Sequence, residues 1–181
     1  ALISNSYFEE ISDRMLGDID VLVSKKDFKK AIKLLKETGY CSKNDHQFFN
    51  KIHFPRLVHK DRVFCVEIHE ELVRHDKIKF FPPDKVLKNK INPTKKYPIP
   101  SEKNLFLHSI YNYQINDLGS LYCQHNFRNL YDSFRIMQKG KINLGLLPKN
   151  KIINRYFIIA GIYSKNFIIS PLNFSMSLYK K

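Results

Sequence analysis

The sequence predicts an α+β fold, in which a small mixed β-sheet with flanking helices precedes a helical C-terminal region. A short strand-like run at 18–23 leads directly into an amphipathic helix, and two strand-like segments joined by a polar turn lie at 56–69. From residue 101 onward, apolar residues recur at helical spacing. We therefore divide the chain into a core at 1–80, a connector rich in proline and lysine at 81–100, and a helical region at 101–181.

The composition is that of a basic globular protein. Its 181 residues are 43% hydrophobic and 13% aromatic, which is enough to bury a core. Lys and Arg outnumber Asp and Glu by 31 to 17, and the formal net charge of +14 favours an anionic partner such as a nucleotide or nucleic acid. The charges are spread along the chain, so a solvated surface without a specific partner is an equal alternative.

The cysteines and apolar runs favour a cytoplasmic protein without a membrane partner. Cys41, Cys65 and Cys123 form no C-x-x-C pair, and their odd number argues against a disulfide framework. No signal peptide is visible, and the longest apolar run, 156–163, is too short to span a bilayer. Because the chain begins at Ala1 rather than at methionine, we expect further residues upstream.

Two carboxylates open the first strand, which follows a helix expected at 1–12. Residues i and i+2 of a strand share a face, so Asp18 and Asp20 project together. Ile19, Val21 and Val23 are expected to pack on the other side. Neighbouring carboxylates repel each other unless a cation lies between them, and Mg²⁺ prefers one or two carboxylates together with substrate phosphates. A solvated strand start is the simpler alternative.

The clearest helix of the sequence follows this strand. Ser24 is the expected N-cap, and Gly39 is the expected C-terminal stop. Lysines fill one face of the helix, which is more typical of a solvated surface than of a phosphate-binding one. The opposite face is an apolar stripe of Phe28, Ala31, Ile32, Leu34 and Leu35.

A hairpin supplies the third acidic residue. Segments 56–60 and 63–69 alternate in polarity around a polar turn at 60–62, and Glu67 and His69 share one face of the second strand. An exposed Glu67 paired with a lysine, and a structural hydrogen-bonding role for His69, are the simpler alternatives. After the connector, helices are expected at 102–115, 121–138 and 149–163, and residues 166–181 are unassigned.

Three carboxylates on strands suit metal-dependent phosphoryl chemistry. Nucleotidyl transfer with two metals needs carboxylates from neighbouring strands that converge on ions roughly 3.5–4 Å apart. Asp18, Asp20 and Glu67 lie on such segments. An Asp-x-Asp pair alone is less specific, because glycosyltransferases use the same pair to hold a metal-bound sugar nucleotide.

Several motifs together resemble the uncharacterised nucleotidyltransferase family of the polymerase-β-like superfamily. The core motifs are Arg14-x3-Asp-Ile-Asp-Val-Leu-Val, Thr38-Gly-Tyr40 and Val66-Glu-Ile-His69. In the helical half, Leu105-x2-His108 and Arg128-Asn-Leu-Tyr-Asp132 are similar to further motifs of this family. The resemblance runs from residue 1 to about 135.

This resemblance implies transfer of a nucleoside monophosphate from an NTP to an acceptor, which is a small molecule, RNA or protein. Asp18, Asp20 and Glu67 would be the metal ligands and catalytic residues, and Glu67 would also accept the proton of the attacking hydroxyl. Apart from the resemblance, Arg14 and His69 are candidate substrate-binding residues that could contact a phosphate. For Arg14, a structural pairing with an aspartate that holds the loop is the slightly favoured alternative. Two Mg²⁺ ions are the expected cofactor, with Mn²⁺ as the alternative.

Two other functions stay open. The superfamily's Gly-Ser or Lys-Gly phosphate-binding turn is expected at or before Ala1, and without it the chain would be a catalytically inactive, basic nucleotide- or RNA-binding regulator. A metal-dependent glycosyltransferase is the third candidate, although the chain is short for one. His108, Arg128 and Asp132 are expected to form an interhelical polar network rather than to bind substrate.

Overall fold

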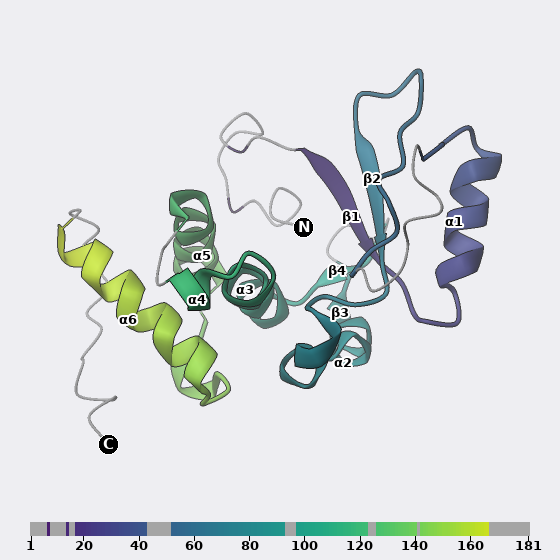
Figure 1. Ribbon diagram of the computed structural model, residues 1–181. Coiled ribbons are helices and arrows are strands. Elements are labelled where there is room, and N and C mark those ends of the chain that lie inside the picture. Colours follow the sequence, from purple (N-terminus) through teal and green to yellow (C-terminus); the bar gives the residue numbers. More distant parts are fainter. Residues whose placement is uncertain are drawn as a thin grey trace. The chain divides into compact units, whose positions relative to one another are not determined.

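The computed structural model confirms the α+β class, with two small sheets and a helical C-terminal region (Figure 1). It describes Tyr7, Arg14 and residues 17–42, 52–92, 97–122, 126–140 and 142–166, without the side chains of 162–166. The chain divides into two compact units, Ala1–Leu105 and Phe106–Lys181. Within the described ranges, no helix has the length and apolar character needed to cross a membrane. Apart from Tyr7, the helix expected at 1–12 lies outside these residues, as do residues 167–181.

The first sheet places the acidic strands side by side. Strand β1 (Asp18–Leu22) pairs in parallel with β2 (Cys65–His69), and this register sets Asp20 opposite Glu67. The hairpin predicted for 56–69 is confirmed on the other side of β2, where Leu57 and Val66 exchange both backbone hydrogen bonds at 2.9 Å. Strand β2 is therefore central, with a parallel neighbour on one side and an antiparallel one on the other.

Helix α1 (Phe28–Glu37) packs its apolar side against β2 rather than β1. The buried cluster between them contains residues of α1, of β2 and of the segment before the hairpin turn: Phe28, Phe54, Leu57, Val66 and Ile68. Of the residues predicted to pack behind Asp18 and Asp20, Val23 contacts this cluster, but Ile19 is 47% and Val21 37% exposed. That prediction is wrong for Ile19 and Val21 because the helix covers the neighbouring strand.

The sequence predicts the C-terminal end of α1 correctly but not its N-terminal end. The prediction of Ser24 as the N-cap is wrong, because the helix begins after Asp27. The Ser24 hydroxyl donates a hydrogen bond to the Asp27 carboxylate and does not cap the helix. Gly39 is confirmed as the stop, with a φ of +95°. Its N–H bonds the Lys36 carbonyl and the Tyr40 N–H bonds the Leu35 carbonyl, both at 3.1 Å, which is the Schellman pattern. Leu34 was predicted to belong to the buried apolar stripe, but its side chain is 60% exposed.

Replacing Gly39 by alanine is expected to destabilise the protein by about 1–2 kcal/mol, because a residue with a Cβ is strained at positive φ. The added Cβ would also lie 2.7 Å from Nε2 of His59, so that ring would have to move. Urea unfolding measures the loss. Gly17→Ala is the matched control, since φ at Gly17 is not positive and its added Cβ meets nothing within 4 Å. Equal stability of the two variants would contradict the prediction.

The predicted connector contains short regular elements. The first is α2 (Pro83–Lys88), which follows a 3₁₀ helix, η3 (His75–Phe80), at the end of the predicted core. After α2, strand β3 (Lys90–Ile91) pairs antiparallel with β4 (Ile99–Pro100). The short helix expected in this segment is therefore confirmed as α2, and the small second sheet was not predicted.

The helical region that begins at residue 102 contains the predicted helices, one of which is divided. Its elements are α3 (Glu102–Tyr111), the π-helical η4 (Asn112–Asn116), α4 (Gly119–Tyr122), α5 (Phe127–Gly140), the 3₁₀ helix η5 (Leu144–Leu146) and α6 (Lys151–Asn166). The helix predicted at 121–138 is divided because Asn126 starts a new one, its side chain accepting from the Arg128 N–H at 2.9 Å. Ser109 of α3 hydrogen-bonds Ser133 of α5 at 2.7 Å, so polar contacts do join these helices.

Candidate active site

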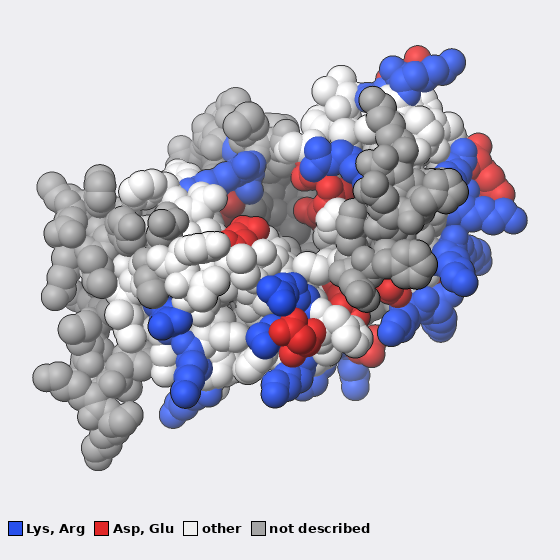
Figure 2. All heavy atoms as spheres, viewed as in Figure 1, with Lys and Arg blue, Asp and Glu red and all other residues white. Residues whose placement is uncertain are grey.

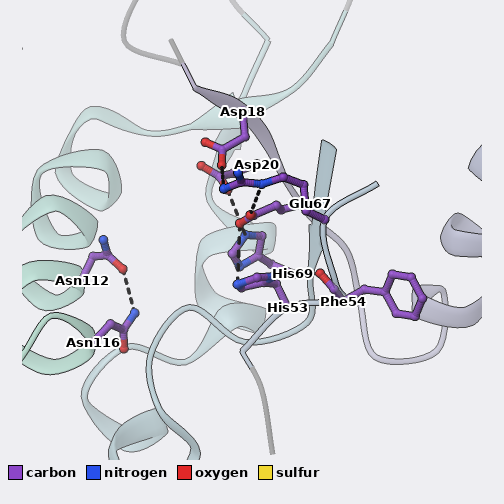
Figure 3. A network of polar contacts seen from close by, with 9 residues as sticks. Asp18, Asp20, His53, Phe54, Glu67, His69, Asn112 and Asn116 are labelled. Atoms are coloured by element: carbon purple, nitrogen blue, oxygen red, sulfur yellow. Dashed lines mark hydrogen bonds and ion pairs between the residues drawn. The ribbon is translucent and has the colours of Figure 1, made fainter. Parts of the chain in front are cut away.

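The strand register gathers acidic and imidazole groups on one face of the first sheet. Val66 and Ile68 point into the core beside α1, so Glu67 and His69 of the same strand point the other way. Because Asp20 is paired with Glu67, the Asp20 carboxylate lies on this face too. Figure 3 shows the acidic groups and the two imidazoles converging in front of β1 and β2.

Asp20, Glu67 and His69 form the part of this cluster that suits a metal ion. Nε2 of His69 lies 3.0 Å from Oδ1 of Asp20 and 3.8 Å from Oε2 of Glu67, and one ligand atom from each residue lies within 4.8 Å of the others. The side chains of Glu67 and His69 are 12% and 15% exposed, whereas that of Asp20 is 59% exposed. The group is therefore open to solvent at Asp20, and its two carboxylates and one imidazole fit a divalent cation.

Asp18 lies outside this set, although the sequence predicts it as a ligand. Its Oδ2 is 2.8 Å from Nη2 of Arg56, and Nε of the same guanidinium is 3.1 Å from Oε1 of Glu67. The hydrogen bond and charge of Glu67, followed by the charge of Asp18, raise the pKa of Arg56 above its ordinary value. Arg56 is thus a fixed cation that bridges carboxylates from two strands.

Arg56 is the first residue of the predicted hairpin, and the sequence pattern did not indicate its place in the site. The pairing of Leu57 with Val66 puts Arg56 opposite Glu67 across the antiparallel strands. The polar turn predicted at 60–62 does not give this pairing, because counting outward from it places Arg56 opposite Val66, one residue short of Glu67. The observed register, set by the pairing of Leu57 with Val66, is shifted by one residue, and this shift brings Arg56 to the face of Glu67.

His53 is a second residue brought to the site by the fold alone. Its Nδ1 lies 2.8 Å from the carbonyl oxygen of Phe54, and since a carbonyl only accepts, Nδ1 is the donor. A neutral His53 therefore carries its lone pair on Nε2, which lies 3.6 Å from Oε2 of Glu67. The His53 ring also lies 4.9 Å from that of His69, centroid to centroid (Figure 3). His53 is thus oriented as a further nitrogen donor beside Asp20, Glu67 and His69, which we call the metal-type group.

Arg14 precedes β1 and is partly buried. The residues between it and Gly17 lie outside the described part of the chain, so its substrate-binding role stays a prediction. The same holds for a phosphate contact by His69, which the structure places next to Asp20.

Comparison with known proteins identifies a family that covers most of the chain. The model of the uncharacterised nucleotidyltransferase family matches residues 1–149, a range that contains both strands of the first sheet and every residue of the acidic cluster. No curated protein and no solved structure matches the chain.

Proposed function

Because the chain belongs to the uncharacterised nucleotidyltransferase family, we propose that it transfers a nucleoside monophosphate from an NTP to an acceptor with the help of a divalent metal ion. One observation carries the metal dependence: Asp20, Glu67 and His69 offer ligand atoms within 4.8 Å of one another, on a pair of strands inside the matched range. The family match also favours this function over the glycosyltransferase alternative.

The proposed reaction is a substitution at the α-phosphorus of the NTP. An acceptor oxygen forms a bond to this phosphorus, the bond from phosphorus to the bridging oxygen of the β-phosphate breaks, and pyrophosphate leaves with the electron pair. When the acceptor is a hydroxyl, its proton passes to a carboxylate. Glu67 is our candidate, since its side chain is 12% exposed against 27% for Asp18 and 59% for Asp20, and its Oε2 faces the imidazoles rather than Arg56.

Asp20, Glu67 and His69 are the proposed ligands of the ion, with His53 beside them. The bound cation supplies positive charge that neutralises the phosphates and the charge developing on them. An imidazole in the donor set favours Mn²⁺ relative to Mg²⁺, which prefers oxygen donors alone. Arg56 adds a second positive charge at the side of Asp18.

Labelled substrates test the reaction type. The full-length protein is incubated with Mn²⁺ or Mg²⁺ and NTP labelled on the α- or the γ-phosphate, together with RNA, protein and small-molecule fractions as acceptors. We expect α-label in an acceptor and γ-label in pyrophosphate. The double variant Asp18→Asn/Asp20→Asn should lose both products. Asp76→Asn, which removes an exposed carboxylate paired with Lys77 at 2.7 Å, should keep them. Transfer of γ-label to an acceptor, or equal product from the double variant, would contradict the proposal.

Binding without catalysis is a second candidate, favoured by the surface of α1. Figure 2 shows Lys and Arg side chains along the outer side of this helix. The exposed lysines in and before α1 are Lys25, Lys26, Lys29, Lys30, Lys33 and Lys36. Such a surface attracts a polyanion, and its affinity falls steeply with salt. Salt-sensitive RNA binding that survives Asp18→Asn/Asp20→Asn, together with no product in the labelling experiment, would favour this candidate.

A further inference from the structure

Glu67 divides the acidic cluster into two halves, each suited to a positive charge. Its Oε1 accepts from Nε of Arg56 at 3.1 Å, on the side of Asp18. Its Oε2 faces Nε2 of His53 at 3.6 Å and Nε2 of His69 at 3.8 Å, on the side of Asp20. The carboxylate at the centre of the site therefore uses one oxygen for each half.

The half beside Asp18 already contains a cation. Two different nitrogens of the Arg56 guanidinium contact carboxylates from two neighbouring strands, at 2.8 Å on Asp18 and 3.1 Å on Glu67. In a two-metal site, the second ion occupies the same kind of position between two carboxylates. Arg56 is 57% exposed, so burial does not hold it there. Its planar, two-pronged guanidinium, matched to two anionic partners, is what keeps it in place.

The charges of the cluster also favour a single ion. Asp18, Asp20 and Glu67 carry three negative charges when ionised. The single charge of Arg56 and the double charge of one divalent ion balance them, provided that His69 is neutral, as a metal ligand must be. A second divalent ion would leave the cluster with excess positive charge, or would have to displace Arg56.

We propose that this site binds one divalent metal ion, at Asp20, Glu67 and His69, and that Arg56 takes the position of a second ion. The inference rests on the proposed metal-dependent function and changes the two ions predicted from the sequence to one. Arg56 then offsets one of the two negative charges of Asp18 and Glu67 before the substrate binds, and its guanidinium has further N–H groups that can contact a phosphate.

Counting bound Mn²⁺ tests this proposal without measuring activity. Free Mn²⁺ is titrated by its electron paramagnetic resonance signal in the presence of the untagged protein. Wild type should bind one ion. Arg56→Gln, which removes the charge but keeps a side chain of similar reach, should bind two. Arg56→Gln/Asp18→Asn should return to one, because the second site then lacks a ligand.

Two control variants accompany these measurements, and circular dichroism confirms that each variant is folded. Arg74→Gln removes an arginine of similar exposure, 54%, that pairs with Asp76 at 3.5 Å, and it should still bind one ion. Arg56→Lys keeps the charge and should also bind one. Two ions in wild type, or only one in Arg56→Gln, would overturn this inference and leave the proposed reaction standing. No bound ion in any variant would overturn the metal dependence of both proposals.

Discussion

Replacing Glu67 by glutamine is expected to reduce nucleotidyl transfer by on the order of 1,000-fold. The substitution keeps the size of the side chain but removes the charge that holds Arg56 through Oε1 and faces the two imidazoles through Oε2. The metal-type group and the Arg56 bridge would both lose their shared anion, and the proposed proton acceptor would disappear with it. Release of labelled pyrophosphate from γ-labelled NTP under single-turnover conditions measures the loss.

Glu71→Gln is the matched control for this prediction. Glu71 and Glu67 are each 9% exposed, and Glu71 accepts a hydrogen bond from Nδ1 of His75 at 2.7 Å. It therefore has similar burial and an imidazole partner, but it does not belong to the metal-type group. We expect this variant to keep most of the activity, with urea unfolding used to compare the stability of the two proteins. Equal activity losses in both variants would show that Glu67 acts only through stability.

Asp20→Asn is expected to weaken Mn²⁺ binding by about 100-fold or more, since even changes outside the direct ligands cost about 10–100-fold. Asp18→Asn should have a much smaller effect, at most about 5-fold, because removing one nearby charge costs about 1 kcal/mol in a solvated site. The difference follows from the structure, in which Asp20 contacts His69 at 3.0 Å and Asp18 contacts Arg56 at 2.8 Å. Calorimetric titration with Mn²⁺ measures both affinities, and equal losses would contradict this division of roles.

The alternation of side chains along a strand predicts much of this site. It places Asp18 and Asp20 on one face, and it places Glu67 and His69 together on one face of the next strand. These are local consequences of a period of two residues. The roles of Arg56 and His53 could not be predicted in this way. Arg56 depends on its pairing with Glu67 of the neighbouring strand, and the His53 ring is oriented by a hydrogen bond to the Phe54 carbonyl. Alternation alone therefore did not separate Asp18 from Asp20.

In the fold too, features set by neighbouring residues could be predicted from the sequence, and features set by packing between distant segments could not. Gly39 ends α1 as predicted, because its positive φ and its backbone hydrogen bonds involve only nearby residues. Ile19 and Val21 were assigned to the core because they are apolar, but which strand a helix covers is decided by packing. The division of the predicted helix at Asn126 is local in origin, and the capping preference of asparagine was the available indication.

The most direct test of this account is the binding of a non-hydrolysable NTP analogue to wild type and Glu67→Gln, measured by calorimetry with Mn²⁺ and again with EDTA. We expect binding to wild type only when Mn²⁺ is present, and affinity at least about 10-fold weaker in Glu67→Gln, because that variant lacks the anion shared by both halves of the site. Equal affinity with Mn²⁺ and with EDTA, unchanged in Glu67→Gln, would show that nucleotides bind elsewhere and would contradict the proposed site.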